Sequence, residues 1–532
     1  MKKIFGILCL FVLSLSLAGC SDEYFDAVPT ASTATPLVFE TTENAAMAIN
    51  GICKTMSRQY LSSQGMNGEG TIKMYYGNYP GNHFMVNLPG WAPLIIPDAY
   101  HTSATSTYTY YPWYYYYRLV GDGNTIIFSI DNAAGPEAEK QFIKAQALTF
   151  RAYAFMMMAQ LYGYRWSDSN NGSTSGLVLR LEPTTDPMPL STLAETYERI
   201  YKDLDEAIDL YTQSKIKRDP EQNWLPDINV AYATYARAAI NKQDYGKAAE
   251  MAVKAREGYP LMTVDEYKAG FFDVNREWIW SSVGKEDETL YYYSYHAYIA
   301  YNSNAGAVRT TPKCMSKDLY ETISLTDIRK ELFLDPMAIG ANGEKSYSKT
   351  TGQAVSSGTD KAYGDALIAY ARSKYPGLEQ PPVTSVASIF AYMQFKIANR
   401  TDPGVGDLNH FRSSEMYLIE AEAQYKLNQQ EKAQQLLVQL IRDSGRDPNY
   451  NCNLTGDALF TEIKRIAQIE LWGEGLDWFM MKRWGDTVIH KHFNEGGNFP
   501  TSCDGTVPPD RGNKWTWVIP NREKDYNPLI VQ

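Results

Sequence analysis

Residues 141–164 read QFIKAQALTFRAYAFMMMAQLYGY and carry the most regular apolar pattern in the chain. Apolar side chains recur there at intervals of three and four residues, the spacing of one face of an α-helix. That face consists of Ala145, Leu148, Ala152, Phe155, Ala159 and Tyr162. Much of the remaining surface is apolar too, through Ala147, Ala154, Met158 and Leu161. A helix that is apolar on nearly all sides is buried, so this segment predicts the central helix of the protein.

Two helical hairpins are predicted further along the chain. The first joins residues 229–240 to 245–257, and the second joins 414–426 to 430–443. Small residues allow the paired helices to approach closely: Ala233, Ala236, Ala248, Ala252, Ala421, Ala423 and Ala433. Such pairs resemble tetratricopeptide units, helix–turn–helix repeats of about 34 residues, although here they are scattered. The predicted fold class is therefore mostly α: a tetratricopeptide-like helix-pair scaffold with an inserted loop-rich, mixed subdomain.

The composition along the chain predicts how this fold is divided. We expect one domain over residues 37–532, with its helical scaffold at about 37–60, 113–257 and 411–486. Residues 60–112 and 258–410 are rich in turn-forming residues and predict long loops, with a short strand at Trp278–Val283. A last helix is expected over Phe460–Trp484, followed by an extended tail at 487–532.

The N-terminus, MKKIFGILCLFVLSLSLAGC, has the pattern of a lipoprotein export signal. Two lysines precede an apolar run, and small residues lead to Cys20. We expect residues 1–19 to be removed, Cys20 to be acylated, and the polar residues 20–36 to be a lipidated tether. Since each buried CH₂ of an acyl chain contributes about 0.8 kcal/mol, several chains would anchor the protein to a membrane.

The charge of the chain restricts its possible partners, and its cysteines raise the question of a disulfide. The chain has 50 basic and 61 acidic residues, a net charge of −11, and no basic run, which argues against nucleic acid as a partner. Cys53, Cys314, Cys452 and Cys503 are far apart in the sequence. Cys452–Cys503 is the candidate disulfide in an exported protein, and buried unpaired thiols are the alternative.

The sequence predicts no catalytic residue, no metal site and no cofactor. Common nucleotide, zinc and hydrolase motifs are absent. His490 and His492 lack a convincing third metal ligand, so surface positions are expected for them. Glu470 and Glu474 lie one helical turn apart and can meet, but a glycosidase pair is defined by three-dimensional geometry that sequence does not give.

Aromatic residues are the main compositional bias, with 40 Tyr and 11 Trp. The string YYPWYYYYR at 110–118 looks like a sugar platform, yet it leads into a helix, so at least half of its rings are expected in the core. Aromatic residues in predicted loops are better ligand candidates, because packing explains them less well. The candidates are Trp91, Tyr100, Tyr108, Tyr295, Tyr298 and Tyr301.

Three ordered motifs resemble those of the SusD/RagB outer-membrane nutrient-binding lipoproteins of Bacteroidetes. They are FRSSEMYLIEAEAQ at 411–424, ELWGEGLDWFMMKRWGD at 470–486 and WVIPNREKDYNPLIVQ at 517–532. FRAYAFMMMAQLYG at 150–163 is similar to the family's central helix. The family often has Arg and Asp three residues apart in the second motif, where this chain has Asp477 and Met480.

This resemblance implies a binding protein on the cell exterior, anchored to the outer membrane by its lipid. It would capture oligosaccharide and deliver it to a SusC-type TonB-dependent barrel, its expected partner. A peptide ligand is the alternative within the same role. A surface hydrolase and a helical-repeat adaptor that docks only proteins are further alternatives.

Overall fold

The computed structural model describes residues 38–60, 66–87, 90, 92–96, 100–286, 294–336, 366, 369–373, 389–509 and 515–530. Helix α6 (Glu137–Tyr162) is its central element, and every side chain from Ala145 to Tyr162 is buried. The predicted central helix is therefore confirmed. Its apolar surface is covered on different sides by α5 (Thr107–Ser129), α7 (Leu193–Ser214) and α3 (Thr42–Thr55).

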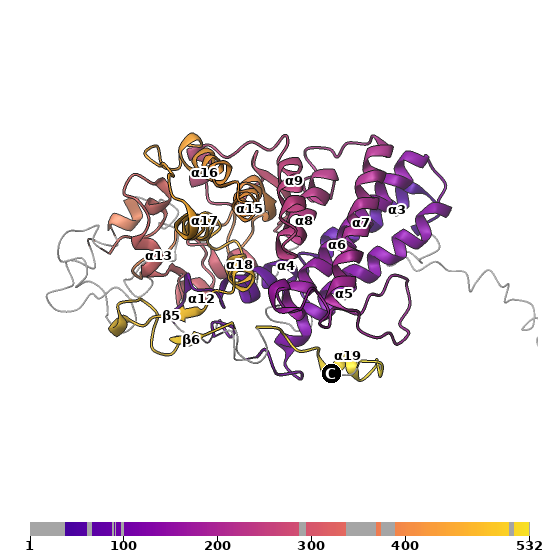
Figure 1. Cartoon of the computed structure of the whole chain (residues 1–532), viewed down its shortest axis with the longest axis horizontal. Helices are drawn as coiled ribbons and strands as arrows, with labels where there is room; N and C mark the ends of the chain where they lie inside the picture. Colours follow the sequence, from indigo (N-terminus) through magenta and orange to yellow (C-terminus); the bar gives the residue numbers. More distant parts are fainter. Residues whose placement is uncertain are drawn as a thin grey trace, which may run out of the picture.

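A row of packed helices continues from this centre (Figure 1). Helix α7 contacts α8 (Ile228–Asn241), which forms a hairpin with α9 (Tyr245–Ala255). Helix α9 packs on α15 (Ser413–Lys426), which packs on α16 (Gln430–Val438) and α17 (Gly456–Glu470). The mostly α prediction is confirmed, and both predicted hairpins are present. The tetratricopeptide-like character of these pairs stays a prediction.

The strands in the described part of the chain form two-stranded antiparallel sheets. They pair β1 (Phe84–Met85) with β3 (Cys314–Met315), β2 (Trp278–Ser282) with β4 (Leu408–Arg412), and β5 (Val488–His490) with β6 (Gly505–Val507). Strand β2 is the predicted one, and Trp278 and Trp280 are both buried. The β2–β4 pairing brings the two ends of the loop-rich segment 258–410 together.

The predicted loop at residues 60–112 is partly wrong, because its middle is helical. Helix α4 (Gly68–Thr71) runs into a π-helical segment, η2 (Ile72–Asn78), and every residue of both is buried. Helix α5 also begins at Thr107, earlier than expected. The many glycines and tyrosines of this segment had suggested a loop. Gly68 is in fact needed in a helical turn, since its φ is +51° and a Cβ would meet the Met56 carbonyl.

Short helical segments supply most other regular structure in the described residues. The α-helical ones are α10 (Val264–Lys268), α11 (Tyr295–Ile299), α12 (Gly306–Arg309), α13 (Lys317–Glu321) and α19 (Asn521–Lys524). The remaining ones are η5 (Ile130–Asn132), η6 (Trp166–Asp168), η7 (Ile328–Leu332), η12 (Gln439–Asp443) and η13 (Phe493–Glu495). The predicted tail at 487–532 thus contains both strand and helix.

The single helix predicted over Phe460–Trp484 is two helices. Helix α17 ends at Glu470, and α18 (Asp477–Trp484) begins after a turn. Gly473 and Gly475 in this turn have φ values of 80° and 81°, a conformation that favours glycine. A Cβ on Gly475 would lie 2.5 Å from the Cβ of Lys73, so the turn also needs glycine for space.

The described cysteines are free thiols. All four are buried and unpaired: Cys53, Cys314, Cys452 and Cys503. The prediction of a Cys452–Cys503 disulfide is therefore wrong, and the alternative of buried unpaired thiols is confirmed. Burial raises the pKa of each of these thiols, which lowers its reactivity. Cys20 and the tether lie outside the described residues, and no described helix has the length and apolar character to cross a membrane.

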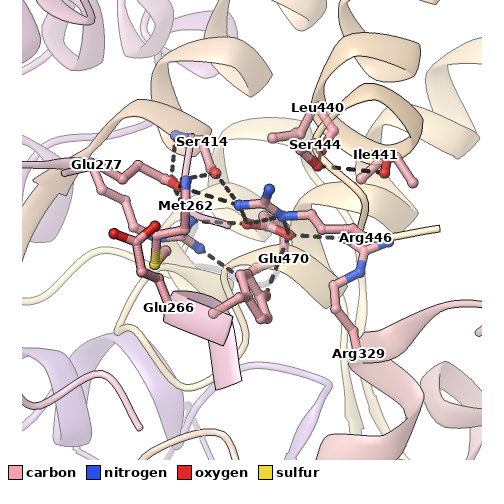
Figure 2. Close-up of polar contacts among 12 residues, drawn as sticks. Met262, Glu266, Glu277, Arg329, Ser414, Leu440, Ile441, Ser444, Arg446 and Glu470 are labelled. Atoms are coloured by element: carbon pink, nitrogen blue, oxygen red, sulfur yellow. Dashed lines mark hydrogen bonds and ion pairs between the residues drawn. The ribbon is translucent and has the colours of Figure 1, made fainter. Parts of the chain in front are cut away.

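A buried ion network joins the middle of the chain to α17 and the turn after it (Figure 2). Arg412 is its centre: the guanidinium lies 2.7 Å from Glu277, 2.9 Å from Glu470 and 2.7 Å from Glu474. Arg446 contacts Glu277 and Glu470 from another side, each within 3.2 Å. The Arg412 side chain is 1% exposed, so these charges depend on one another rather than on water.

Two further cations extend this network toward the loop-rich segment. Arg329 pairs with Asp327 at 2.6 Å and with Glu470 at 3.0 Å. Lys396 pairs with Glu474 at 2.7 Å and also donates to the backbone carbonyls of Glu470 and Trp472. We call the set Asp327, Arg329, Lys396, Arg412, Arg446, Glu277, Glu470 and Glu474 the buried ion network.

Replacing Arg412 by Met tests how far the fold depends on this network. The variant removes a cationic partner from three buried carboxylates. We therefore expect the free energy of unfolding to decrease by about 3–5 kcal/mol. Urea denaturation measures this. Arg442→Met is the matched control, because the Arg442–Asp443 pair is exposed and is expected to contribute less than about 1 kcal/mol. Equal losses in the two variants would contradict the role of the network.

The network also predicts how stability changes with pH. Burial alone would raise the pKa of Glu474, but Arg412 and Lys396 outweigh it and lower this pKa to about 2. The unfolded chain has a glutamate pKa of about 4.3. The stabilisation is therefore complete above about pH 5 and is lost as the pH falls toward 2.

We expect the free energy of unfolding to decrease between pH 5 and 2.5, with a shallower slope in Glu474→Gln. Urea titrations at each pH measure both slopes. Identical slopes for the two proteins would show that Glu474 does not titrate as the structure requires.

Candidate ligand-binding cleft

A cleft with a cavity volume of about 390 Å³ opens in the loop-rich segment. Its size falls within the range of small-ligand sites, about 300–1,000 Å³. Aromatic side chains supply much of its lining: Tyr301, Tyr320, Phe333, Tyr370 and Phe395. Leu325 adds an apolar edge and is 90% exposed. Tyr301 and Tyr370 are half-buried, whereas Tyr320, Phe333 and Phe395 are buried, so the cleft has two partly exposed rings above a buried aromatic floor.

The rings are held by aromatic neighbours behind them. Tyr301 meets Phe395 edge-on, with ring centroids 5.5 Å apart. Tyr320 packs on Tyr392 at 5.0 Å. Phe333 meets Trp472 edge-on at 5.0 Å, which ties the cleft to the turn between α17 and α18.

Charged groups are interspersed among these rings. Lys330 lies 4.4 Å above the Tyr320 ring and donates to the backbone carbonyls of Tyr320 and Ile323. Lys268 pairs with Glu331 at 2.8 Å. Burial and then the Asp335 carboxylate raise the pKa of both Tyr320 and Tyr370, so Asp335 acts on both hydroxyls. The cleft thus offers hydroxyl, carboxylate and ammonium groups beside flat apolar faces.

The buried ion network fixes the cleft walls from behind. Arg329 precedes Lys330 in η7, and its guanidinium is held by Asp327 and Glu470. Lys396 follows Phe395 and is held by Glu474. Backbone hydrogen bonds then join the two walls, from Phe395 to Leu332 at 2.7 Å and from Leu334 to Met393 at 2.8 Å. The lining residues are consequently placed by rigid, buried neighbours.

The ligand candidates predicted from sequence do not form one site. Tyr301 lines the cleft. Tyr100 and Tyr108 pack on each other at 4.9 Å, and Tyr108 lies 6.1 Å from Tyr75. The Tyr75 hydroxyl is 3.1 Å from that of Tyr298. Three candidates therefore meet in a separate cluster through Tyr75.

Of the ligand candidates, Tyr295 and Tyr298 do not line the cleft beside Tyr301. Their side chains are buried, with exposed fractions of 7% and 3%. Tyr295 donates its hydroxyl to the Gly473 carbonyl, and both residues belong to α11, which packs on η2. Trp91 lies outside the described residues. Ligand contact by Trp91, Tyr100, Tyr108, Tyr295 and Tyr298 stays a prediction.

Sequence reasoning missed most of the cleft. Tyr320, Phe333, Tyr370 and Phe395 are separated by long stretches of chain, and their surroundings have no apolar period. The only local signal is aromatic and charged residues side by side at positions 328–335, IRKELFLD. That signal is weak, because the same mixture occurs in ordinary helices.

Two family models match the sequence. One, described as "Starch-binding associating with outer membrane", matches residues 53–240, and the model of the SusD family matches residues 278–532. Together they take in most of the chain. The chain belongs to the SusD family. A search of the curated proteins finds no match.

Solved structures share the SusD-family fold along nearly their whole length. A SusD-like carbohydrate-binding protein from Bacteroides vulgatus superposes with a TM-score of 0.74 at 21% identity, over 92% of this chain and 98% of that one. A SusD superfamily protein from the same species gives 0.71 at 19%, over 93% and 99%. One from Bacteroides thetaiotaomicron gives 0.70 at 20%, over 92% and 99%.

Glu470 and Glu474, from the second SusD-family motif, belong to the buried ion network. Glu470 and Glu474 are buried, and Arg412 contacts both, which leaves them no space for a substrate between them. His490 is buried as well, between the carbonyls of Gly81 and Cys503, so its predicted surface position is wrong. The described residues contain no group of His, Cys, Asp and Glu suited to a metal ion.

Proposed function

We propose that this SusD-family protein captures oligosaccharide at the cell surface and delivers it to a SusC-type TonB-dependent barrel. The aromatic cleft is the observation that carries the binding role. The family description of starch binding at the outer membrane supports the ligand class, as does a carbohydrate-binding relative with the same fold. Lipidation of Cys20 would hold the protein to the outer membrane, facing the exterior.

The chemistry of the cleft suits a neutral sugar. A tyrosine face can cover the C–H face of a pyranose and bury apolar area, while polar groups orient its hydroxyls. Tyr301 and Tyr370, the half-buried tyrosines of the cleft, provide such rings, and Asp335 stands beside the Tyr370 hydroxyl. The Lys268–Glu331 ion pair balances charge at the edge. Binding without bond cleavage is the proposed mode of action.

Glycan binding is tested by removing rings from the cleft. Screening the protein on a neutral-glycan array identifies a ligand, and calorimetry then compares Tyr370→Ala with wild type. Because a lost stacking contact costs on the order of 1 kcal/mol or more, we expect roughly tenfold weaker binding.

Tyr526→Ala is the matched control, since Tyr526 is 83% exposed and does not line the cleft. Its affinity should equal that of wild type. Equal affinity of Tyr370→Ala and wild type would remove the cleft from the binding site, and steady release of cleaved products would contradict a pure binding role.

The transport role is tested separately by co-purification. The lipidated protein is extracted from native outer membrane in mild detergent, and its companions are identified by mass spectrometry. We expect a TonB-dependent barrel in near-stoichiometric amount. Recovery of the protein alone, under conditions that preserve other membrane complexes, would contradict a stable complex with the barrel.

A further inference from the structure

One face of α5 carries a row of tyrosines that the cleft does not use. Tyr110 and Tyr114 lie one turn apart, and both are half-buried rather than covered. Their ring centroids are 5.7 Å apart. Tyr60 continues the row, with its centroid 6.0 Å from that of Tyr114. The other face of the same helix is buried, as in Tyr111, Tyr115 and Tyr116, so these rings differ from their neighbours.

An arginine closes each end of this row. The Arg522 guanidinium lies 4.5 Å from the centre of the Tyr110 ring, and that of Arg118 lies 5.1 Å from the centre of the Tyr60 ring. Both arginines are exposed. We call Tyr60, Tyr110, Tyr114, Arg118 and Arg522 the tyrosine–arginine strip.

The arginines keep N–H groups for a ligand: a guanidinium has five N–H donors, and the side-chain hydrogen bond of Arg118 is to Tyr114. Among the described residues, neither forms an ion pair with a carboxylate. Asp122 is the carboxylate that acts on Arg118, one turn further along α5, and burial raises the Asp122 pKa while Arg118 lowers it. Stacking on tyrosine holds each guanidinium plane in place while leaving its N–H groups able to bind an anion.

The strip is separate from the cleft. The cleft is built from residues 268–395, close to α13, whereas the strip lies on α5 and beside α19. Figure 1 places α13 and α5 in opposite halves of the molecule. A ligand in the cleft therefore does not cover the strip.

We propose that the tyrosine–arginine strip binds an extended polysaccharide that carries carboxylate or sulfate groups. The half-buried rings in a row offer apolar surface to successive sugar units, next to the guanidinium groups that lie over Tyr110 and Tyr60. A guanidinium at each end pairs with an anionic group through two parallel N–H···O bonds. The inference rests on the proposed glycan-binding role and adds a second site with a different ligand class.

The net negative charge of the protein disfavours non-specific binding of anionic polymers. The chain carries a net charge of −11, so an anionic polymer is repelled by the protein as a whole. Attraction must then come from a local basic surface with complementary shape. Binding of an anionic polysaccharide would consequently indicate a specific site such as the strip rather than non-specific adsorption.

Affinity electrophoresis tests the proposal with the full chain. Native gels contain dextran sulfate, polygalacturonate or unmodified dextran, which separates sulfate, carboxylate and neutral sugar. We expect retardation by at least one anionic polymer and none of similar strength by dextran. The double variant Arg118→Gln/Arg522→Gln should bind at least tenfold more weakly, and Arg118→Lys/Arg522→Lys should fall between it and wild type.

Controls separate this proposal from the cleft. Tyr370→Ala should keep wild-type retardation by the anionic polymer, and the double Gln variant should keep wild-type binding of the neutral cleft ligand. The strip is excluded if wild type is not retarded by either anionic polymer, or if the double Gln variant is retarded as strongly as wild type. Failure of the protein to bind a neutral glycan would exclude the cleft as a glycan site and would not contradict the strip proposal.

Discussion

Arg412 and the carboxylates around it are the constraint on which the rest of the structure depends. A guanidinium that is 1% exposed cannot rely on water, so Glu277, Glu470 and Glu474 must all be in position. Glu277 lies directly before β2, Glu470 at the end of α17, and Glu474 in the following turn. The network therefore stabilises only the arrangement in which those distant segments are in contact. Because breaking a buried pair costs several kcal/mol, partly formed arrangements are disfavoured.

The same network connects the fold to the cleft. Arg329 and Lys396 are each bound on the inside and each have a neighbour in sequence that lines the cleft. Trp472, in the turn beside Glu470, supports Phe333 from behind. The cleft walls are short helices, α10, α13 and η7, together with extended segments. Buried charges hold these short elements in place, where longer helices would otherwise be required.

This construction explains what the sequence could predict and what it could not. The 3.6-residue period of α6 and the alanine-rich hairpins are local signals, and they located the scaffold. The turn at Gly473 and Gly475 ended a helix that its apolar pattern would have continued, because backbone conformation there depends on contact with Lys73. Cleft residues such as Tyr320 and Tyr370 come together only through long-range contacts. Of the aromatic candidates that the structure describes, only Tyr301 lines the cleft.

Part of the tyrosine excess has a structural cause that sequence composition hides. The first turn of α5 leaves carbonyl groups short of helical donors, because Pro112 has no N–H and Trp113 donates its N–H to the Tyr162 hydroxyl. Buried tyrosines supply donors there: Tyr76 donates to the Tyr108 carbonyl and Tyr162 to that of Thr109. A phenylalanine would fill the same space but leave the carbonyl unsatisfied, at a cost of about 1–3 kcal/mol. Tyr76 and Tyr162 are therefore explained by the backbone around Pro112 rather than by ligand binding. A tyrosine indicates ligand binding only where part of its ring reaches solvent, as do the half-buried Tyr301 and Tyr370 of the cleft and Tyr110 and Tyr114 of α5.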